Sequence, residues 1–368
     1  MIQNKNLLVA AAALVLLVVL IALAFLIPSP AEKSTPPQET VTPPSTEGTA
    51  PLQTQSQLRQ ELTVGICLPA EIDAWTATGA ILQKQLSQRG YTTELVYGDG
   101  TAKAQNQLLL ELVKKNVSCI VLAPVDSAAM TEAGTAALEK DIPILSYGAL
   151  LMDTEAVSGY ICYDYFEMGA DLARYIEKKL SLSNAAKAER SFTMELFMGS
   201  PEDYNAVLLH QGLLSELEPY LTLGTLECKS HRTAFEDSCI FDWSETAAEK
   251  ACDSRLRHYP EGKPDIMICA SDSIAAGVIR SLEKRGITTE NMPLITGNGA
   301  TSVGLANLAA GKQALTVKTD SAVPAEVCCA MVDWVVLGQK PTFPLIETYN
   351  NVKNIPTALC GFTIVEGE

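Results

Sequence analysis

Short apolar segments alternate with amphipathic segments from Leu62 onward, and this alternation constrains the fold more than any other feature. The amphipathic segments repeat apolar residues at intervals of three and four, as helices do, whereas the short apolar segments have the length of buried strands. Such an order over about 300 residues predicts parallel sheets covered by helices on both faces. The predicted strands are residues 62–68, 92–98, 118–124, 142–148, 159–164, 192–198, 221–228, 265–271, 293–298 and 314–319.

The length of this region predicts two lobes. About 300 residues exceed what one such sheet ordinarily needs, so the α/β region divides into two doubly wound units. In open α/β sheets, ligands bind beyond the carboxyl ends of the strands. A binding site is therefore expected at those ends.

Polar or aromatic side chains follow nearly every predicted strand. Many of them are equally expected as helix N-caps, which favour Ser, Asp and Asn. Glu202 and Asp203 are interpreted as acids in the first turn of a helix, where they stabilise the helix dipole. The residues that follow strands are Glu71, Asp73, Trp75, Asp126, Asp164, Asn205, Asp272, Asn298 and Lys318.

The first 60 residues are not expected to belong to the folded region. Leu7 to Ile27 is apolar without a charge, long enough to cross a hydrocarbon core of roughly 30 Å. Residues 1–27 are thus interpreted as a transmembrane anchor, with Lys5 on the cytoplasmic side. Cleavage as a signal segment after Ala31 is the alternative. Residues 28–60 are rich in Pro, Thr and Ser, which predicts a disordered tether.

Charge and cysteine content exclude some classes of protein. The formal net charge of −16 comes with no concentrated basic patch, so nucleic acid is not an expected partner. Ten cysteines occur without a C-x-x-C motif, several of them inside strand-like segments. We interpret most of them as reduced, buried, small apolar residues.

No motif indicates an enzyme or a metal protein. There is no Gly-x-Ser-x-Gly elbow. Cys228, His231 and Cys239 lack a fourth ligand at regular spacing, so we do not predict a zinc site. No cofactor is expected.

Blocks of sequence in a fixed order carry a family resemblance over the folded region. The blocks are LPAEIDAWTATGAILQKQL, CIVLAPVDSAAM, IPILSYGALL, YICYDYFEMGADLARYI, ELFMGSPEDYNA, DWSETAAEKACDSRL, ICASDSIAAGVIRSLEKRG, PLITGNGATSVGLANLAAGKQALTVKTD and TYNNVKNIPT. They resemble the type 1 periplasmic binding proteins, in particular the xylose and multiple-sugar-binding branch of the ribose-type group. The resemblance runs from about Leu62 to Val365.

The resemblance implies two doubly wound parallel-sheet lobes joined by three crossovers. From the sequence we place the crossovers near Ser158, Thr319 and Ile346. The N-terminal lobe is then expected to comprise residues 61–158 plus 320–345. The C-terminal lobe is expected to comprise residues 159–319 plus 346–368.

The resemblance also implies a function, which is to bind a sugar between the lobes by hinge closure and deliver it to an ABC permease. Such a protein is monomeric, works at the outer face of the cytoplasmic membrane and is not an enzyme. Aromatic rings cover the apolar faces of a sugar, while polar side chains bind its hydroxyls. By family position the pocket candidates are Trp75, Asp126, Tyr147, Asp164, Asn205, Trp243, Asp272, Asn298 and Lys318. Asp272 is equally expected as a helix cap.

The chain departs from the family pattern at ligand positions. Gly148 and Ala149 stand where the family has an Asp-Arg pair, Gly299 replaces an aspartate, and Tyr165 replaces an asparagine. Three explanations remain open. The ligand is larger or less hydroxylated; other groups, such as Glu71, Asp73 or Glu202, replace the lost ones; or the ligand is not a sugar.

Two other functions share the fold. One is a sensory protein that presents a bound small molecule to a membrane receptor or kinase. The other is a sugar-regulated repressor, which would need N-terminal DNA-binding helices where this chain has its apolar segment.

Overall fold

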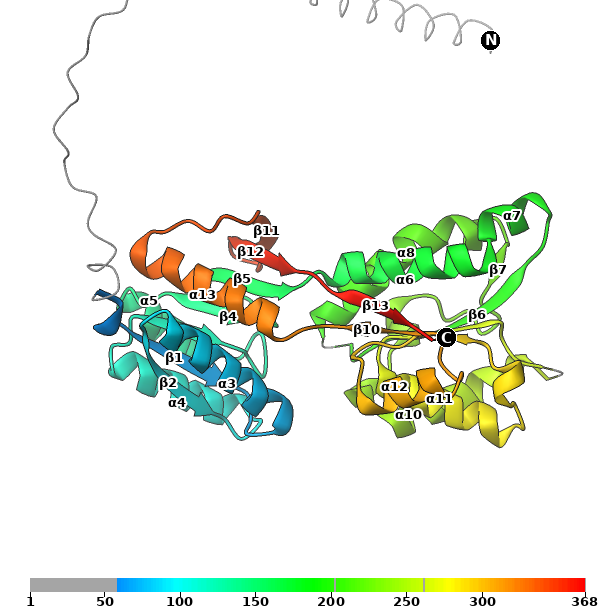
Figure 1. The fold of residues 1–368 in the computed structure, drawn as a ribbon, viewed down its shortest axis with the longest axis horizontal. Helices are drawn as coiled ribbons and strands as arrows, with labels where there is room; N and C mark the ends of the chain where they lie inside the picture. Colours follow the sequence, from blue (N-terminus) through cyan, green and yellow to red (C-terminus); the bar gives the residue numbers. More distant parts are fainter. Residues whose placement is uncertain (1–57, 202, 261, 368) are drawn as a thin grey trace, which may run out of the picture. The chain divides into compact units, whose positions relative to one another are not determined.

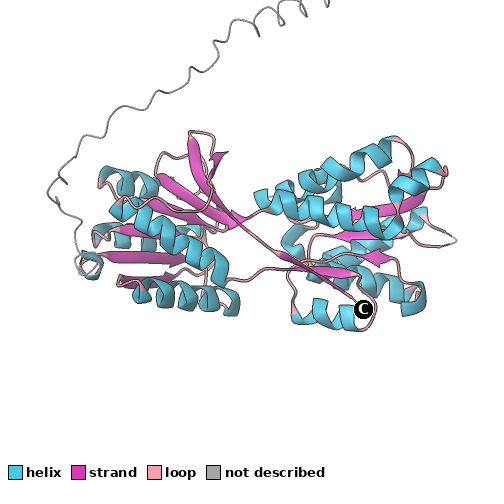
Figure 2. Cartoon of the chain, turned by 45° about the horizontal axis from the view of Figure 1, so that its top comes forward, coloured by secondary structure: helices cyan, strands magenta, loops and turns pink. Residues whose placement is uncertain are grey.

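The computed structural model describes residues 58–367 apart from 202 and 261. Strands and helices alternate along this part of the chain (Figure 1), and helices flank the strands of each sheet (Figure 2). The predicted α/β class is therefore confirmed. The predicted anchor and most of the predicted tether lie outside the described residues. Within the described part, no helix combines the length and the apolar character needed to cross a membrane.

The first lobe is built on a seven-stranded sheet of order β11-β12-β5-β4-β3-β1-β2. All neighbours pair in parallel except β11 and β12, an antiparallel pair at one edge. The strands are β1 (Thr63–Leu68), β2 (Thr92–Tyr97), β3 (Cys119–Leu122), β4 (Ile144–Tyr147), β5 (Val157–Tyr163), β11 (Ile346–Tyr349) and β12 (Asn354–Cys360). The helices are α3 (Asp73–Gln88), α4 (Ala102–Lys114), α5 (Thr131–Glu139) and α13 (Ala322–Leu337).

Successive residues of β1 enter two different cores, because side chains alternate across a strand. Ile66 packs in a cluster that includes residues of α3 and α13. Cys67 packs in a second cluster with residues of α4 and α5. Both faces of the sheet are therefore covered, which explains why these strands are apolar without alternation.

The second lobe holds a parallel sheet of order β7-β6-β8-β9 and an antiparallel pair, β10 and β13. A bridge between Asn298 and Val317 joins the segment after β9 to β10. The strands are β6 (Phe192–Phe197), β7 (Leu226–Glu227), β8 (Ile266–Cys269), β9 (Leu294–Ile295), β10 (Leu315–Lys318) and β13 (Thr363–Glu366). The α-helices are α6 (Tyr165–Leu180), α7 (Leu182–Lys187), α8 (Tyr204–Thr222), α9 (Phe235–Ser238), α10 (Glu245–Arg255), α11 (Asp272–Lys284) and α12 (Ser302–Ala309). Short 3-10 turns are η1 (Phe241–Trp243), η2 (Leu256–His258) and η3 (Thr289–Asn291).

Strand pairing moves two of the expected lobe boundaries. β5 pairs with β4 and β12, so residues 159–163 belong to the first sheet and not to the second lobe. β11 and β12 also join the first sheet, and only β13 reaches the second lobe. The chain therefore passes between the sheets after β5, after β10 and between β12 and β13. The first and third crossings lie near Asp164 and Gly361 rather than at Ser158 and Ile346.

One buried carboxylate ties α13 to the start of the described chain. Asp333 is 6% exposed. It accepts hydrogen bonds from Arg59 Nε at 3.1 Å, Arg89 Nη1 at 2.6 Å and Tyr91 Oη at 2.7 Å. Because a buried charge is stable only when paired and hydrogen-bonded, each of these groups depends on the others.

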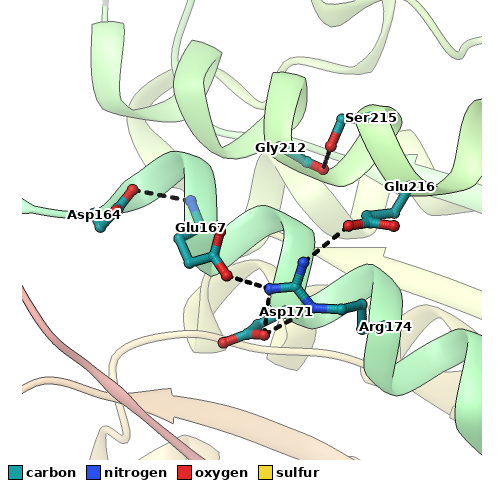
Figure 3. Close-up of polar contacts among 7 residues, drawn as sticks. All are labelled: Asp164, Glu167, Asp171, Arg174, Gly212, Ser215 and Glu216. Carbon is teal, nitrogen blue, oxygen red and sulfur yellow. Dashed lines mark hydrogen bonds and ion pairs between the residues drawn. The ribbon is translucent and has the colours of Figure 1, made fainter. Parts of the chain in front are cut away.

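A second ionic cluster lies on the surface between α6 and α8 (Figure 3). Arg174 contacts Glu167 and Asp171 on its own helix and Glu216 on α8. Each of these side chains is 37–51% exposed. Water competes for such contacts, so the cluster contributes little to stability.

All ten cysteines are free, as predicted for most of them. Nine are buried, and Cys239 is partly exposed.

Candidate functional site

Three adjoining cavities lie between residues of the two lobes, and together we call them the cleft. The C-lobe cavity has a volume of about 310 Å³, the central cavity about 800 Å³ and the N-lobe cavity about 250 Å³. Tyr165 lines all three cavities. Asp203 and Asn205 line both the central and the C-lobe cavities. The three cavities therefore share wall residues from both lobes.

The cleft lies where the sequence predicted it, beyond the carboxyl ends of parallel strands. Trp75 follows β1, Asp126 follows β3 and Tyr147 ends β4, and all three line the central cavity. Trp243 and Asn298 line the C-lobe cavity. Parallel strands bring residues that are far apart in sequence to one edge of a sheet.

Aromatic rings form much of the cleft wall. The rings of Tyr163 and Tyr165 pack edge to face, with centroids 6.4 Å apart. Trp243 is the last residue of η1 and lies against Gly199, whose missing side chain leaves space for the indole ring. Burial raises the pKa of Tyr147, Tyr163 and Tyr165, so their hydroxyls stay protonated and able to donate hydrogen bonds.

Asn205 connects the two lobes across the central cavity. Its Nδ2 donates a hydrogen bond to the carbonyl oxygen of Gly148 at 3.0 Å. The hydroxyl of Tyr160 lies 3.2 Å from the same carbonyl and 3.4 Å from Asn205 Oδ1. Asn205, near the start of α8, is thus bonded to the segment that follows β4 in the other lobe.

Asp272 is not part of the cleft wall. Its side chain is completely buried. Oδ1 accepts bonds from Gln313 Nε2 at 2.9 Å and Thr316 Oγ1 at 2.7 Å. Oδ2 accepts from the amide and the hydroxyl of Thr301, at 2.8 and 3.0 Å. These bonds tie α11 to the start of α12 and to β10, which is a structural role within the second lobe.

Two further predicted residues lie outside the lining of the three cavities. Asp164 caps α6, where its carboxylate accepts the amide of Glu167 at 3.0 Å. Lys318 is exposed at the end of β10, whereas the next residue, Thr319, lines the C-lobe cavity.

Several cleft residues were not expected from the sequence, and three of them are polar residues that come after a strand. Ser271, immediately before Asp272, lines the C-lobe cavity. Thr319 does the same. Asp203 lines two cavities, although its sequence pattern indicated only a helix start. The position of each at a strand end was the available signal, but it did not tell which neighbour faces the cleft.

The charge in the cleft has one sign. Among the described residues that line the three cavities, only Asp126 and Asp203 carry a charge, and there is no Lys, Arg or His. Burial raises the pKa of Asp203, while the backbone amides of Asn205 and Ala206 oppose this shift. In the same part of the chain, no group of three His, Cys, Asp or Glu residues is arranged to hold a metal ion. The described wall of the cleft offers aromatic faces, amide and hydroxyl groups and two carboxylates.

Comparison with known proteins gives the same family throughout. The model of the family described as "Periplasmic binding protein domain" matches residues 64–340. The multiple sugar-binding periplasmic protein SbpA of Azospirillum brasilense is 30% identical over 300 residues, covering 80% of this chain and 83% of that protein. The multiple sugar-binding periplasmic receptor ChvE of Rhizobium radiobacter is 30% identical over 302 residues, covering 81% and 84%.

Solved structures agree with this relationship. An ABC transporter solute-binding protein from Clostridium phytofermentans, with bound β-D-glucose, is 27% identical with a TM-score of 0.73, covering 83% of this chain and 94% of that one. A carbohydrate transporter solute-binding protein from Chloroflexus aurantiacus, in complex with D-glucose, has the same fold at 21% identity, with a TM-score of 0.70 and coverage of 83% and 92%. On the extent of these matches, the chain belongs to the periplasmic binding protein domain family.

Proposed function

We propose that this protein binds a sugar in the cleft and delivers it to an ABC-type importer. The observation that carries the proposal is the cleft itself, whose wall combines aromatic rings with amide, hydroxyl and carboxylate groups from both lobes. The names of the relatives support a sugar as the ligand. The protein is a binding protein and not an enzyme.

The aromatic and polar groups have separate tasks in this proposal. Trp75 and Trp243 cover apolar faces of the sugar ring, because C–H faces pack well on flat aromatic side chains. Asp126, Tyr147, Asn205 and Asn298 bind hydroxyls. Rotation about the three crossings brings both sets onto the ligand at once. Asp164, Asp272 and Lys318 have no part in ligand contact.

Cellular location is the second part of the proposal. The protein works as a monomer outside the cytoplasmic membrane, where its family acts. Residues 7–27 hold it there as an uncleaved anchor, and residues 28–60 act as the tether. Carbonate extraction of membranes from the producing cell tests this part: an anchored chain stays with the membrane, and a cleaved one is released.

The ligand proposal is tested by thermal unfolding of the full chain, purified in a mild detergent, against pentoses, hexoses, disaccharides and deoxy sugars. A ligand that binds only the folded state raises the temperature of the unfolding midpoint by mass action. At a ligand concentration one hundred times Kd, the gain in unfolding free energy is about 2.7 kcal/mol. A shift with a sugar at micromolar concentration supports the proposal. Cooperative unfolding with no shift for any sugar contradicts it.

A further inference from the structure

Asp203 occupies the junction of the cleft. It ends the turn after β6 and is the N-cap of α8. Its neighbours in both the central and the C-lobe cavity are Tyr165 and Asn205. A ligand that reaches from one cavity to the other therefore passes this carboxylate.

The carboxylate of Asp203 is only partly used by the protein. Oδ1 accepts the backbone amide of Asn205 at 2.9 Å, which is the capping bond. No hydrogen bond from a side chain and no ion pair to this carboxylate occurs among residues 58–367 as described. The backbone amide of Ala206 also stabilises this carboxylate. A half-buried carboxylate has more acceptor capacity than two backbone amides fill.

Among the described residues that line the cavities at Asp203, none carries a positive charge. Tyr160 and Tyr165 feel its negative charge, which adds to burial in raising their pKa values. The one other charged side chain in the described lining is Asp126. An anionic ligand would meet like charge without a compensating cation, whereas a neutral ligand offers hydroxyl donors to a free acceptor.

We propose that Asp203 is a ligand-binding residue that sets the charge selectivity of the cleft: its carboxylate accepts a ligand hydroxyl and excludes acidic sugars such as uronates and sugar phosphates. The inference rests on the proposed function and adds the substrate class, which is sugars without a negative charge. It also names a carboxylate that takes the place of Asp272 in the expected ligand set.

Matched pairs of sugars test the inference by calorimetry on the full chain in detergent. The pairs are glucose with glucuronate, galactose with galacturonate, and glucose with glucose 6-phosphate. For whichever neutral member binds, the acidic partner is expected to bind at least about tenfold more weakly. Asp203→Asn keeps a good N-cap but removes the charge. The difference in affinity between the neutral and the acidic sugar, here called the affinity gap, is therefore expected to shrink to about threefold or less. The neutral sugar is also expected to bind this variant more weakly than the native protein.

Asp265→Asn is the control. Asp265 lies just before β8, at the amino end of that strand, whereas the cleft lies beyond its carboxyl end. Its carboxylate accepts hydrogen bonds from the amide and the hydroxyl of Thr193. This variant should keep the full affinity gap between neutral and acidic sugars. Equal affinity for neutral and acidic partners, or a gap unchanged in Asp203→Asn, overturns the inference and leaves the proposed function standing. Failure of every sugar, neutral or acidic, to bind overturns both.

Discussion

The indole ring of Trp243 lies against Gly199, and a Cβ atom at position 199 would overlap with the six-membered part of that ring. The turn that ends β6 therefore positions the aromatic wall of the C-lobe cavity. Gly199 is required here for close approach, since no larger residue leaves room for the ring.

The first prediction follows from this contact. Gly199→Ala should displace Trp243 and weaken ligand binding by about tenfold, with a loss of roughly 1–3 kcal/mol in stability from overpacking. Calorimetry and urea unfolding measure the two effects. Gly262→Ala is the control, because a Cβ there meets nothing within 4 Å. Unchanged affinity in Gly199→Ala would show that the ring does not contact the ligand.

The second prediction separates the structural role of Asp272 from a ligand role. Asp272→Ala removes a buried acceptor of four hydrogen bonds and leaves the donors of Thr301, Gln313 and Thr316 unpaired. The expected loss is roughly 3–5 kcal/mol of unfolding free energy. Molecules that remain folded should bind ligand with nearly normal affinity. Normal stability combined with lost binding would instead make Asp272 a ligand residue.

The position of Asp272 also shows how far the sequence could predict the site. The strand–helix alternation predicted the fold class and the edge of the sheets at which Trp75, Asn205 and Asn298 lie. It could not predict that Ser271 faces the C-lobe cavity while Asp272, one residue later, turns into the lobe. That choice depends on where Thr301, Gln313 and Thr316 lie, and these residues are distant in sequence.

The lobe boundaries could not be predicted fully from the sequence either, because they depend on which strands pair. Nothing in the pattern of residues 354–360 indicates that they pair with β5 in the first sheet. Partner choice arises from contacts between strands nearly 200 residues apart, such as Ala358 with Ile161. The first crossover therefore lies after β5 and not before it, and the third lies after both β11 and β12.

The third prediction compares the two ionic clusters. Asp333→Ala leaves Arg89 and Tyr91 without their buried partner and should lower the unfolding free energy by roughly 3–5 kcal/mol. Arg174→Ala, on the exposed cluster of Figure 3, should cost less than about 1 kcal/mol. The difference should persist in 1 M salt, because screening acts mainly on exposed pairs. Equal losses of unfolding free energy in the two variants would mean that burial does not determine how much each cluster stabilises the fold.

The last prediction concerns the thiols. Burial raises the pKa of Cys252 and Cys360 to about 11, and that of Cys67 and Cys329 to about 12. Only the thiolate reacts with alkylating reagents, and at pH 8 a thiol of pKa 11 is thiolate on the order of one part in a thousand. Because Cys239 alone is partly exposed, the native protein should react rapidly at no more than this one site.

Mass spectrometry after iodoacetamide treatment counts the modified cysteines. All ten should react once the protein is unfolded without reductant, and Cys239→Ser should remove the rapid reaction of the folded protein. Raising the pH should speed labelling of the buried thiols only where the fold opens, since a larger thiolate fraction has no effect while the reagent is excluded. Cysteines that stay unmodified after unfolding would be disulfide-bonded. Such a result would contradict the structure, in which all ten cysteines are free.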